Sequence, residues 1–452
     1  MSIRISIVLV TVLSVLLFIK VGVTCSSDRP NIVLILADDL GYGDLGCYGH
    51  PVAKTPHIDL LARQGVRFTQ HYSNGPECTP TRTALMTGRY QQRVGGLECA
   101  IGTGNVGRYD EAIRLADQHD LGLPIDEAVL PSALRESGYA CGLFGKWHLG
   151  YEPKHNPMEY GWDEFFGYLG GNVHYFNHRE TSDLHVLFQG RDPVDREGYM
   201  THLITDDSIA FVKKNKDRPF FMFVSHESPH FPFQGPQDHD KLVTEENWTE
   251  KNAEAYVAML EDLDAEVGRL VKAIDQVGIT DNTIVIFVSD NGGYAGAGHM
   301  GPLRGSKSTT FEGGIRVPLI IRWPGHIPTG MTSEQVCVTF DLTESIFTLA
   351  GATMPTKTLD GYDIIRHITE QRANVVRTLF WRGKRDDVTW SAVRDGELKL
   401  VRHRKGDSTE QWLFDLSKDI GEASDLAATQ PLDRARLRKL LADWERNVDA
   451  DR

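Results

Sequence analysis

Four runs of apolar residues constrain most strongly how this chain can fold. They cover residues 31–36, 138–144, 219–225 and 283–288, and each is rich in aliphatic or aromatic side chains. An unbroken apolar run of this length is typical of a strand that is buried on both faces of a parallel sheet. Residues 253–277 have the apolar spacing of a long amphipathic helix. The sequence therefore predicts an α/β fold around a mostly parallel sheet.

Polar residues follow the ends of these four runs. Open α/β sheets bind ligands at the carboxyl ends of their strands, so this edge is the predicted functional edge. Each group also has a simpler interpretation, because aspartate and Asn-Gly are turn formers and Lys-x-His often lies on a solvated surface. Taken together, the aspartates and the asparagine form an oxygen-rich set that suits a hard cation. The residues are Asp38, Asp39, Lys146, His148, His226, His230, Asp290 and Asn291.

A cysteine stands at the start of a short predicted helix in residues 78–89, CTPTRTALMTGR. Pro80 suits an early helical position and Gly88 a helix end. Cys78 then lies at the positive end of the helix dipole, with Arg82 one turn further along on the same side. These residues alone fit a structural cysteine as well as a site that attracts anions.

The C-x-P-x-R motif of residues 78–82, followed by T-G-R, resembles the signature of the type I sulfatases. Other blocks that resemble this family occur in the family's order and span nearly all of the chain after the N-terminal segment. The resemblance implies an alkaline phosphatase-like fold, with a large mixed, mostly parallel sheet sandwiched by helices. It also implies that a formylglycine-generating enzyme oxidises Cys78 to Cα-formylglycine. The further blocks are residues 30–39, 145–150, 289–292 and 307–318.

The same resemblance implies catalytic roles for six residues. Cys78 provides the nucleophile as formylglycine, and Arg82 holds an anionic oxygen of the site. Lys146 and Lys307 resemble the family's sulfate-binding lysines. Two histidines complete the set, because His148 resembles the one beside the formylglycine and His230 the family's second active-site histidine. His226 is expected to be structural, whereas His299 and Arg304 are candidates for contacts with the leaving group.

A divalent cation is also implied. Its expected ligands all offer oxygen, which favours Ca²⁺ first and Mg²⁺ second, and argues against zinc. Such a cation would neutralise a sulfate oxygen and orient the nucleophile. The expected ligands are Asp38, Asp39, Cys78 as formylglycine, Asp290 and Asn291.

The implied function is hydrolysis of a sulfate ester, on a sulfated sugar or an aryl sulfate. The layout is most similar to arylsulfatases and N-acetylgalactosamine-6-sulfatases. Two alternatives stay open. Phosphonate monoester and phosphodiester hydrolases of the same superfamily share the C-x-P-x-R motif. A non-catalytic, calcium-dependent glycan-binding protein would keep Cys78 as a thiol.

The N-terminus reads as a secretory signal peptide at residues 1–25. Arg4 precedes an apolar run that ends at Ile19 and is shorter than the ~20 residues of a membrane span. We therefore expect export, to a periplasm or the outside, and no stable membrane span. Cleavage near Cys25 is favoured over lipoprotein attachment, because Gly22 stands where a lipobox needs an aliphatic residue.

Charge and cysteine spacing exclude other classes. Cleavage would remove Arg4 and Lys20 but no acidic residue, and would take the formal net charge from −14 to −16. An acidic chain without a basic, aromatic-rich run is not expected to bind nucleic acid. The remaining cysteines lack the C-x-x-C spacing of zinc sites, and the sequence leaves their pairing open. They are Cys47, Cys99, Cys141 and Cys337.

Past residue 328 the pattern changes to short alternating segments separated by Asp-Gly and Lys-Gly turns, which is typical of an antiparallel meander. A final helix is expected at about residues 432–448. The sequence thus predicts a catalytic domain at 28–353, a connector at 354–376 and a smaller α+β subdomain at 377–452. The alternating segments are residues 389–393, 398–402 and 411–416.

Overall fold

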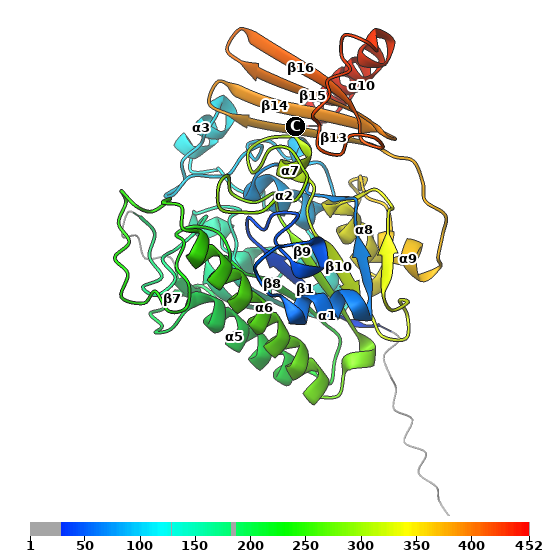
Figure 1. Cartoon of the computed structure of the whole chain (residues 1–452). Helices are drawn as coiled ribbons and strands as arrows, with labels where there is room; N and C mark the ends of the chain where they lie inside the picture. The colour runs from blue at the N-terminus through cyan, green and yellow to red at the C-terminus, as the bar shows by residue number, and fades with distance from the viewer. Residues whose placement is uncertain (1–28, 128, 182–186, 452) are drawn as a thin grey trace, which may run out of the picture.

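A sheet of ten strands forms the centre of the computed structural model (Figure 1), which describes residues 29–127, 129–181 and 187–451. The predicted signal peptide at residues 1–25 lies outside the described residues. The order of the strands across the sheet is β11 (Met331–Ser333), β2 (Val66–Phe68), β10 (Leu319–Arg322), β9 (Thr283–Ser289), β1 (Asn31–Ala37), β8 (Phe220–Ser225), β4 (Ala140–Lys146), β5 (Glu164–Tyr168), β6 (Leu187–Gln189) and β7 (Asp192–Pro193).

The middle of this sheet is parallel. Strands β9, β1, β8, β4 and β5 pair in parallel, whereas β10 and β6 pair with them in the antiparallel sense. The four apolar runs of the sequence are β1, β4, β8 and β9, and every residue in these strands is buried. The predicted mixed, mostly parallel sheet is confirmed.

Helices cover both faces of the sheet, as predicted. Val33 and Ile35 of β1 belong to one hydrophobic core, and Ile32 and Leu34 face the other, as strand alternation requires. The first core is closed by α1 (Pro56–Gln64), α5 (Met200–Asn215) and α6 (Ala253–Gln276). The second core is closed by α2 (Cys78–Thr87), α4 (Leu130–Glu136) and α8 (Thr339–Ala350).

The C-terminal residues form a four-stranded antiparallel sheet, with one strand more than the alternating segments predicted. Figure 1 shows this sheet above α2 and the short helix α7 (Glu312–Ile315), so it caps the carboxyl ends of the parallel strands. Trp381 anchors it, because its indole nitrogen donates to the carbonyl of Ser73 at 2.8 Å. The elements are β13 (Thr378–Arg385), β14 (Val388–Asp395), β15 (Leu398–Lys405), β16 (Ser408–Asp415) and α10 (Pro431–Asp449).

Smaller elements complete the described chain. The expected connector at residues 354–376 contains a short helix, α9 (Ile364–Thr369). A two-stranded sheet pairs β3 (His71–Tyr72) with β12 (Cys337–Val338), and α3 (Asp110–Asp117) packs in a separate cluster.

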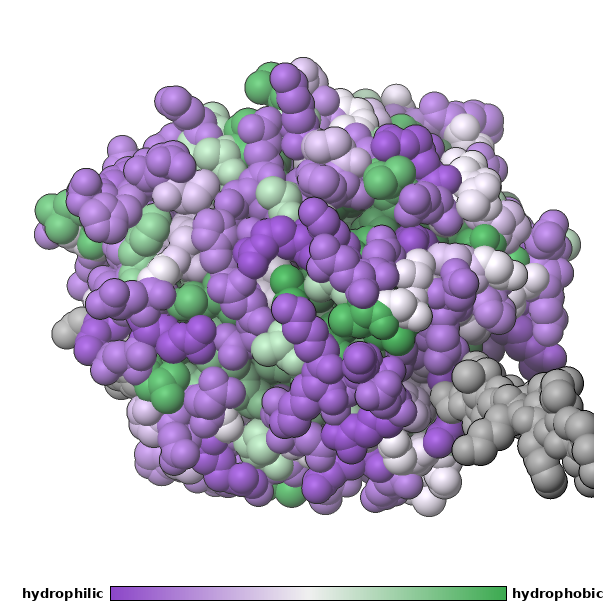
Figure 2. Space-filling model, turned by 90° about the horizontal axis from the view of Figure 1, so that it is seen from below, coloured by the Kyte–Doolittle hydropathy of each residue, from purple (hydrophilic) through white to green (hydrophobic). Residues whose placement is uncertain are grey.

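Two further points of the sequence analysis concern membrane spans and cysteine pairing. The face shown in Figure 2 is mostly hydrophilic, with its hydrophobic residues scattered over it. No helix in the described part of the chain combines the length and the apolar composition that crossing a membrane would take. Cys47, Cys99, Cys141 and Cys337, whose pairing the sequence left open, are all free thiols.

Buried His71 makes the stability of the fold sensitive to acid. Burial lowers its pKa to about 3, against an ordinary value of 6.5. As the pH falls below 6.5, the unfolded chain binds a proton that the folded chain does not, so the free energy of unfolding decreases by about 1 kcal/mol per pH unit. We expect His71→Phe to remove ~2 kcal/mol of the stability difference between pH 7 and pH 5 in urea unfolding. His239→Phe, at a 72% exposed side chain, is the control and should change nothing. An unaltered acid slope in His71→Phe would refute this prediction.

Candidate active site

Chemically active side chains converge at the carboxyl ends of the central parallel strands. β1 is followed by Asp38 and Asp39, and β9 by Asp290 and Asn291, while Lys146 ends β4. The first turn of α2 lies against this edge and brings Cys78 to it. The switch point of an open α/β sheet is where such a site is expected.

Asp38 and Asp39 are fully buried and lie beside the cysteine. The Sγ atom of Cys78 is 3.2 Å from Oδ1 of Asp38 and 4.0 Å from Oδ1 of Asp39. Lys146 forms an ion pair with Asp38 at which neither side chain is exposed. Although burial raises the pKa of Asp38, the Lys146 ammonium and its cationic neighbours hold it well below its usual range. Both carboxylates are thus held next to residue 78.

The Cys78 thiol itself is in a poor state for nucleophilic attack. It is 1% exposed, and burial, followed by the Asp38 carboxylate, raises its pKa well above the ordinary value. Cysteine reacts as the thiolate, so these surroundings disfavour chemistry by the unmodified side chain. The helix N-terminus alone would favour an anion here, but burial and the neighbouring carboxylate dominate.

Arg82 ties the cysteine helix to the sheet. Its Nε and Nη2 atoms contact Oδ2 of Asp290 at 3.1 and 3.0 Å. Its Nη1 atom donates to the carbonyl of Lys146 at 3.0 Å and to Oγ of Ser225 at 2.6 Å. One guanidinium therefore fixes the ends of β9, β4 and β8 relative to α2.

Asn291 carries a buried acceptor that has no partner within the described residues. The amide nitrogen of Asn291 donates to Oδ1 of Asp39 at 2.7 Å. The Oδ1 atom of Asn291 accepts no hydrogen bond from the described residues. Asp38, Asp39, Cys78 and His230 each offer a ligand atom, and these atoms lie within 4.8 Å of one another. Buried oxygen atoms that lack donors are what a hard cation satisfies, so the residues present fit a divalent ion.

His148 presents a free basic nitrogen. Its Nε2 atom lies 2.9 Å from the carbonyl of Ile101, which can only accept, so Nε2 carries the hydrogen. Its Nδ1 atom is buried without a partner among the described residues. Burial, and then the Lys146 ammonium, lower the pKa of His148 well below its usual value. The neutral ring therefore offers an unprotonated Nδ1 atom.

Lys307 and His230 close the opposite side of the site. The Nζ atom of Lys307 lies 2.7 Å from Oδ1 of Asp39, 3.5 Å from Sγ of Cys78 and 3.1 Å from Nε2 of His230. Nδ1 of His230 donates to the carbonyl of Phe231 at 2.6 Å, so its Nε2 accepts from the lysine. Burial, and then Lys307, lower the pKa of His230 to about 4.

Two residues of the site hold an uncommon backbone conformation. Asp39 and His148 have φ angles of 61° and 58°, in the left-handed region. Non-glycine residues cost of order 1–3 kcal/mol in sparsely populated conformations, which cluster at functional sites. Thr79 of α2 helps to hold His148, because its hydroxyl donates to the His148 carbonyl at 3.1 Å.

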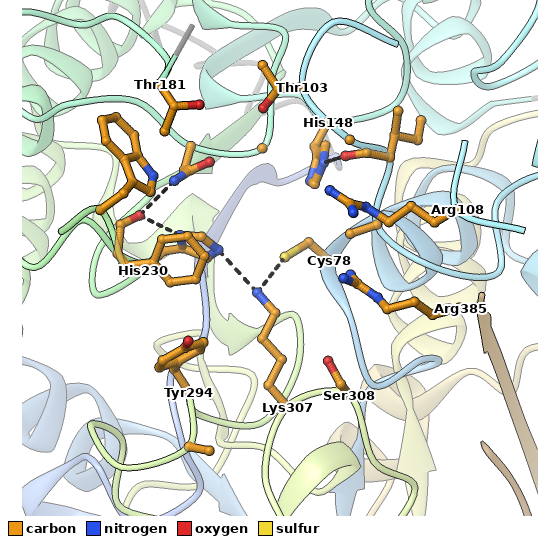
Figure 3. A pocket seen from close by; sticks show the side chains of 18 of the residues that line it. Cys78, Thr103, Arg108, His148, Thr181, His230, Tyr294, Lys307, Ser308 and Arg385 are labelled. Carbon is orange, nitrogen blue, oxygen red and sulfur yellow. Dashed lines mark hydrogen bonds between the residues drawn. The ribbon is translucent and has the colours of Figure 1, made fainter. Parts of the chain in front are cut away.

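A pocket of about 490 Å³ opens directly onto Cys78 (Figure 3). His148, His230 and Lys307 line it together with residues that the sequence did not single out. Among these are two arginines, Arg108 from a loop and Arg385 from β13, whose guanidinium groups point toward the cysteine in Figure 3. No motif marks either residue. Other unpredicted residues of the wall are Thr103, Trp248, Lys251 and Tyr294.

His299 and Arg304, the candidates for contacts with the leaving group, are not among the residues that line this pocket. The backbone nitrogen of His299 donates to Asp44, and Arg304 packs on Phe311 with its guanidinium 4.1 Å from the ring centre. His226, which we expect to be structural, is buried.

Family models and known proteins similar to this chain are a further source of evidence about the site. A family model described as Sulfatase matches residues 30–352, and one described as N-sulphoglucosamine sulphohydrolase, C-terminal, matches residues 306–446. N-acetylgalactosamine-6-sulfatase of Sus scrofa is 33% identical over 383 residues, which cover 80% of this chain and 70% of the pig protein. Arylsulfatase A of Homo sapiens is 33% identical over 463 residues, covering 90% and 85%.

A solved structure is similar over nearly the whole chain. The crystal structure of Ps i-CgsB in complex with k-i-k-neocarrahexaose superimposes with a TM-score of 0.80 at 30% sequence identity. The match covers 92% of this chain and 93% of that chain. The similarity therefore includes the C-terminal sheet as well as the larger part of the fold.

Proposed function

Because this chain belongs to the sulfatase family and is a sulfuric ester hydrolase, we propose that it removes sulfate from a sulfated carbohydrate with a Cα-formylglycine formed from Cys78. The observation that carries this proposal is the setting of Cys78, whose thiol touches Asp38 at 3.2 Å and Lys307 at 3.5 Å at the floor of the pocket. The sugar is favoured because the relatives include an N-acetylgalactosamine-6-sulfatase and a protein solved with a carrageenan-type hexaose, k-i-k-neocarrahexaose.

The proposed cofactors are two. A formylglycine-generating enzyme would oxidise Cys78, and a divalent cation, Ca²⁺ first and Mg²⁺ second, would bind at Asp38, Asp39, Asp290 and Asn291. Support for the cation comes from the unpartnered Oδ1 atom of Asn291 and from the all-oxygen character of the set. Together the two groups would supply a hydroxyl aimed at sulfur and positive charge for the sulfate oxygens.

Side chains of the protein would bind the sulfate group and transfer the protons of the reaction. Lys146 and Lys307 would bind the sulfate oxygens. Lys307 would give a proton to the departing alcohol, either directly or through Nε2 of His230, which accepts from the lysine at 3.1 Å. His148, whose Nδ1 atom has no hydrogen to donate, would accept the proton whose removal releases sulfate. Arg82 would hold Asp290 in place, and its guanidinium would oppose the rise in the pKa of Asp290, to about 7, that burial and the Asp38 carboxylate cause.

Paired substrates test the proposal. Hydrolysis of an aryl sulfate and of the matching aryl phosphate should be measured on protein from its native host, with a sulfated oligosaccharide panel alongside. We expect sulfate release to dominate. Dominant phosphate cleavage would favour the phosphonate monoester or phosphodiester hydrolase instead, and the absence of turnover with an unmodified Cys78 thiol would favour a calcium-dependent glycan-binding protein.

Removal of the cation should abolish most of the activity. We expect chelation to lower kcat at least ~100-fold, since charge stabilisation by a metal amounts to several kcal/mol. Added Ca²⁺ should restore the rate and raise the Tm of the chelated protein. Asp39→Asn should lose that Tm shift, whereas Asp281→Asn, at an exposed aspartate, should keep it. A Ca²⁺-dependent Tm shift that survives in Asp39→Asn would place the ion elsewhere.

We also propose that the protein is exported, on the strength of the charged and apolar N-terminal segment. Sequencing the N-terminus of the mature protein tests this, and a chain that keeps residues 1–25 would contradict it.

A further inference from the structure

We propose that Arg108 and Arg385 form a second anion-binding site in the catalytic pocket, which takes a further negatively charged group of the substrate beside the sulfate that is hydrolysed. The ligand is a sulfate ester or a uronate carboxylate, because both present a planar edge or face of oxygens that a guanidinium binds with two hydrogen bonds. This inference rests on the proposed function and narrows its substrate class to sugars with at least two anionic groups.

Backbone hydrogen bonds bring the two arginines together from distant parts of the chain. Gly102 and Val106 pair with each other through bonds of 2.8 and 3.2 Å, which closes a tight loop just before Arg108. The carbonyl of Arg108 then accepts from the backbone nitrogen of Asp386 at 2.6 Å. Asp386 directly follows Arg385 at the end of β13, so the C-terminal sheet holds both guanidinium groups at one wall of the pocket.

Arg108 has no counter-charge in the described part of the chain. No ion pair between described residues involves it, and its Nε atom is buried without a hydrogen-bond partner among them. Its Nη2 atom lies 3.1 Å from the position that a Cβ on Gly102 would take, so a side chain there would crowd the guanidinium. A cation that is partly buried and unpaired is costly. An anion arriving with the substrate would satisfy it.

The carboxylate of Glu77 orients Arg385, and the two arginines together with Glu77 still carry a net positive charge. Its Nε and Nη2 atoms donate to Glu77 at 3.1 and 3.0 Å. Glu77 is itself held by the backbone nitrogen of Ala100 at 2.7 Å and by the hydroxyl of Ser308 at 2.9 Å. Glu77 thus pairs with Arg385 and not with Arg108, so the two arginines keep a net positive charge at the pocket wall.

The arginines are distinct from the cations that serve the hydrolysed sulfate. Lys146 and Lys307 are bound to Asp38 and Asp39 at the floor, whereas Figure 3 shows Arg108 and Arg385 on the wall beside Cys78. The chain carries a formal net charge of −14, so its overall field repels an anionic sugar. Local, fixed cations are therefore needed to hold a substrate of that charge.

A second cavity extends from the same wall. It has a volume of about 160 Å³, shares Ser308 and Arg385 with the larger pocket, and reaches Trp390 of β14. Arg385 stands between the two cavities. A neighbouring sugar unit could occupy the smaller one while its anionic group meets the arginines.

Binding measurements in a Cys78→Ala background test the site without turnover. The ligands are a monosulfated galactose glycoside, its disulfated counterpart and a monosulfated disaccharide with a uronic acid. We expect Arg108→Gln to raise the Kd of the disulfated or the uronate ligand at least ~10-fold more than that of the monosulfated one, as loss of a charge-assisted hydrogen bond predicts. Arg108→Lys should recover part of the effect, because it keeps the charge and loses the fork. Whichever ligand responds identifies the anion.

Arg404→Gln, at an exposed arginine on β15, makes the same change in net charge and should leave the ratio of Kd values unaltered. An equal effect of Arg108→Gln on all three ligands, or no effect, would overturn the second site, provided that the melting temperature matches the parent protein. Hydrolysis of the monosulfated glycoside by the wild-type protein is measured separately. If the wild-type protein did not hydrolyse this glycoside, the result would count against the proposed function and not against the arginine site.

Discussion

Cys78→Ala is expected to lower kcat for sulfate ester hydrolysis by on the order of 10⁴-fold or more, as the loss of a covalent nucleophile does in other hydrolases. The reason lies in the surroundings of the residue. Burial and the carboxylate of Asp38 raise the pKa of the thiol well above its ordinary value, which keeps it protonated, and its Sγ atom lies 3.2 Å from Asp38. Under the proposed function, residue 78 supplies the nucleophile after its conversion to formylglycine.

The measurement is the rate on an aryl sulfate, together with the mass of the peptide that contains residue 78. Protein from the native host should yield a peptide lighter by the difference between cysteine and formylglycine. Cys141→Ala is a matched control, because Cys141 is equally buried but lies within β4, in the core. It should retain full activity. Comparable rates for Cys78→Ala and the parent protein would show that residue 78 is not the nucleophile.

The central sheet could be predicted because its strands are buried on both faces. Such strands carry no polar alternation, and the runs of β1, β4, β8 and β9 stand out by apolar content alone. β13 was missed for the opposite reason. Its segment TLFWRGKR ends in basic residues and contains Gly383, because that end of the strand faces the pocket and Glu77 rather than a core.

The floor of the site was accessible to sequence reasoning because strand ends meet at one edge. Asp38 and Asn291 are far apart in the chain, yet β1 and β9 pair in register, so the residues just after these two strands must lie close together. The wall of the pocket was not accessible in this way. Arg108 reaches it through a loop closed at Gly102 and Val106, and Arg385 through the packing of a second sheet.

The position of His299 and Arg304 off the pocket lining has a similar physical cause. Both are close in sequence to Lys307, but the chain turns between them, with left-handed φ angles at Gly301 and Gly305. Nearness along an irregular loop fixes no direction for a side chain. Arg304 consequently points to Phe311 and to the carbonyl of Glu422, away from the pocket.

Arg82→Ala is expected to cost about 3–5 kcal/mol of the free energy of unfolding, in the range found when one partner of a buried ion pair is removed. Arg82 is 1% exposed and Asp290 is fully buried, so the substitution leaves a carboxylate without its counter-charge. The carbonyl of Lys146 and the hydroxyl of Ser225 lose their donor as well. Because Arg82 also holds the strand ends that carry Asp290, a proposed metal ligand, and Lys146, a proposed sulfate ligand, activity should fall with stability.

Urea unfolding of Arg82→Ala measures the loss in the free energy of unfolding. Arg366→Ala is the matched control. Arg366 pairs with Glu370 on the surface, where the two side chains are 58% and 46% exposed, and such pairs contribute under about 1 kcal/mol. Arg82→Lys tests the geometry, because an ammonium keeps the charge yet cannot reach Asp290, Lys146 and Ser225 at once. We expect it to fall between the parent protein and Arg82→Ala. If Arg82→Ala cost no more than Arg366→Ala, water or a shifted side chain would have to satisfy Asp290, and α2 would not depend on this arginine for its place over the sheet.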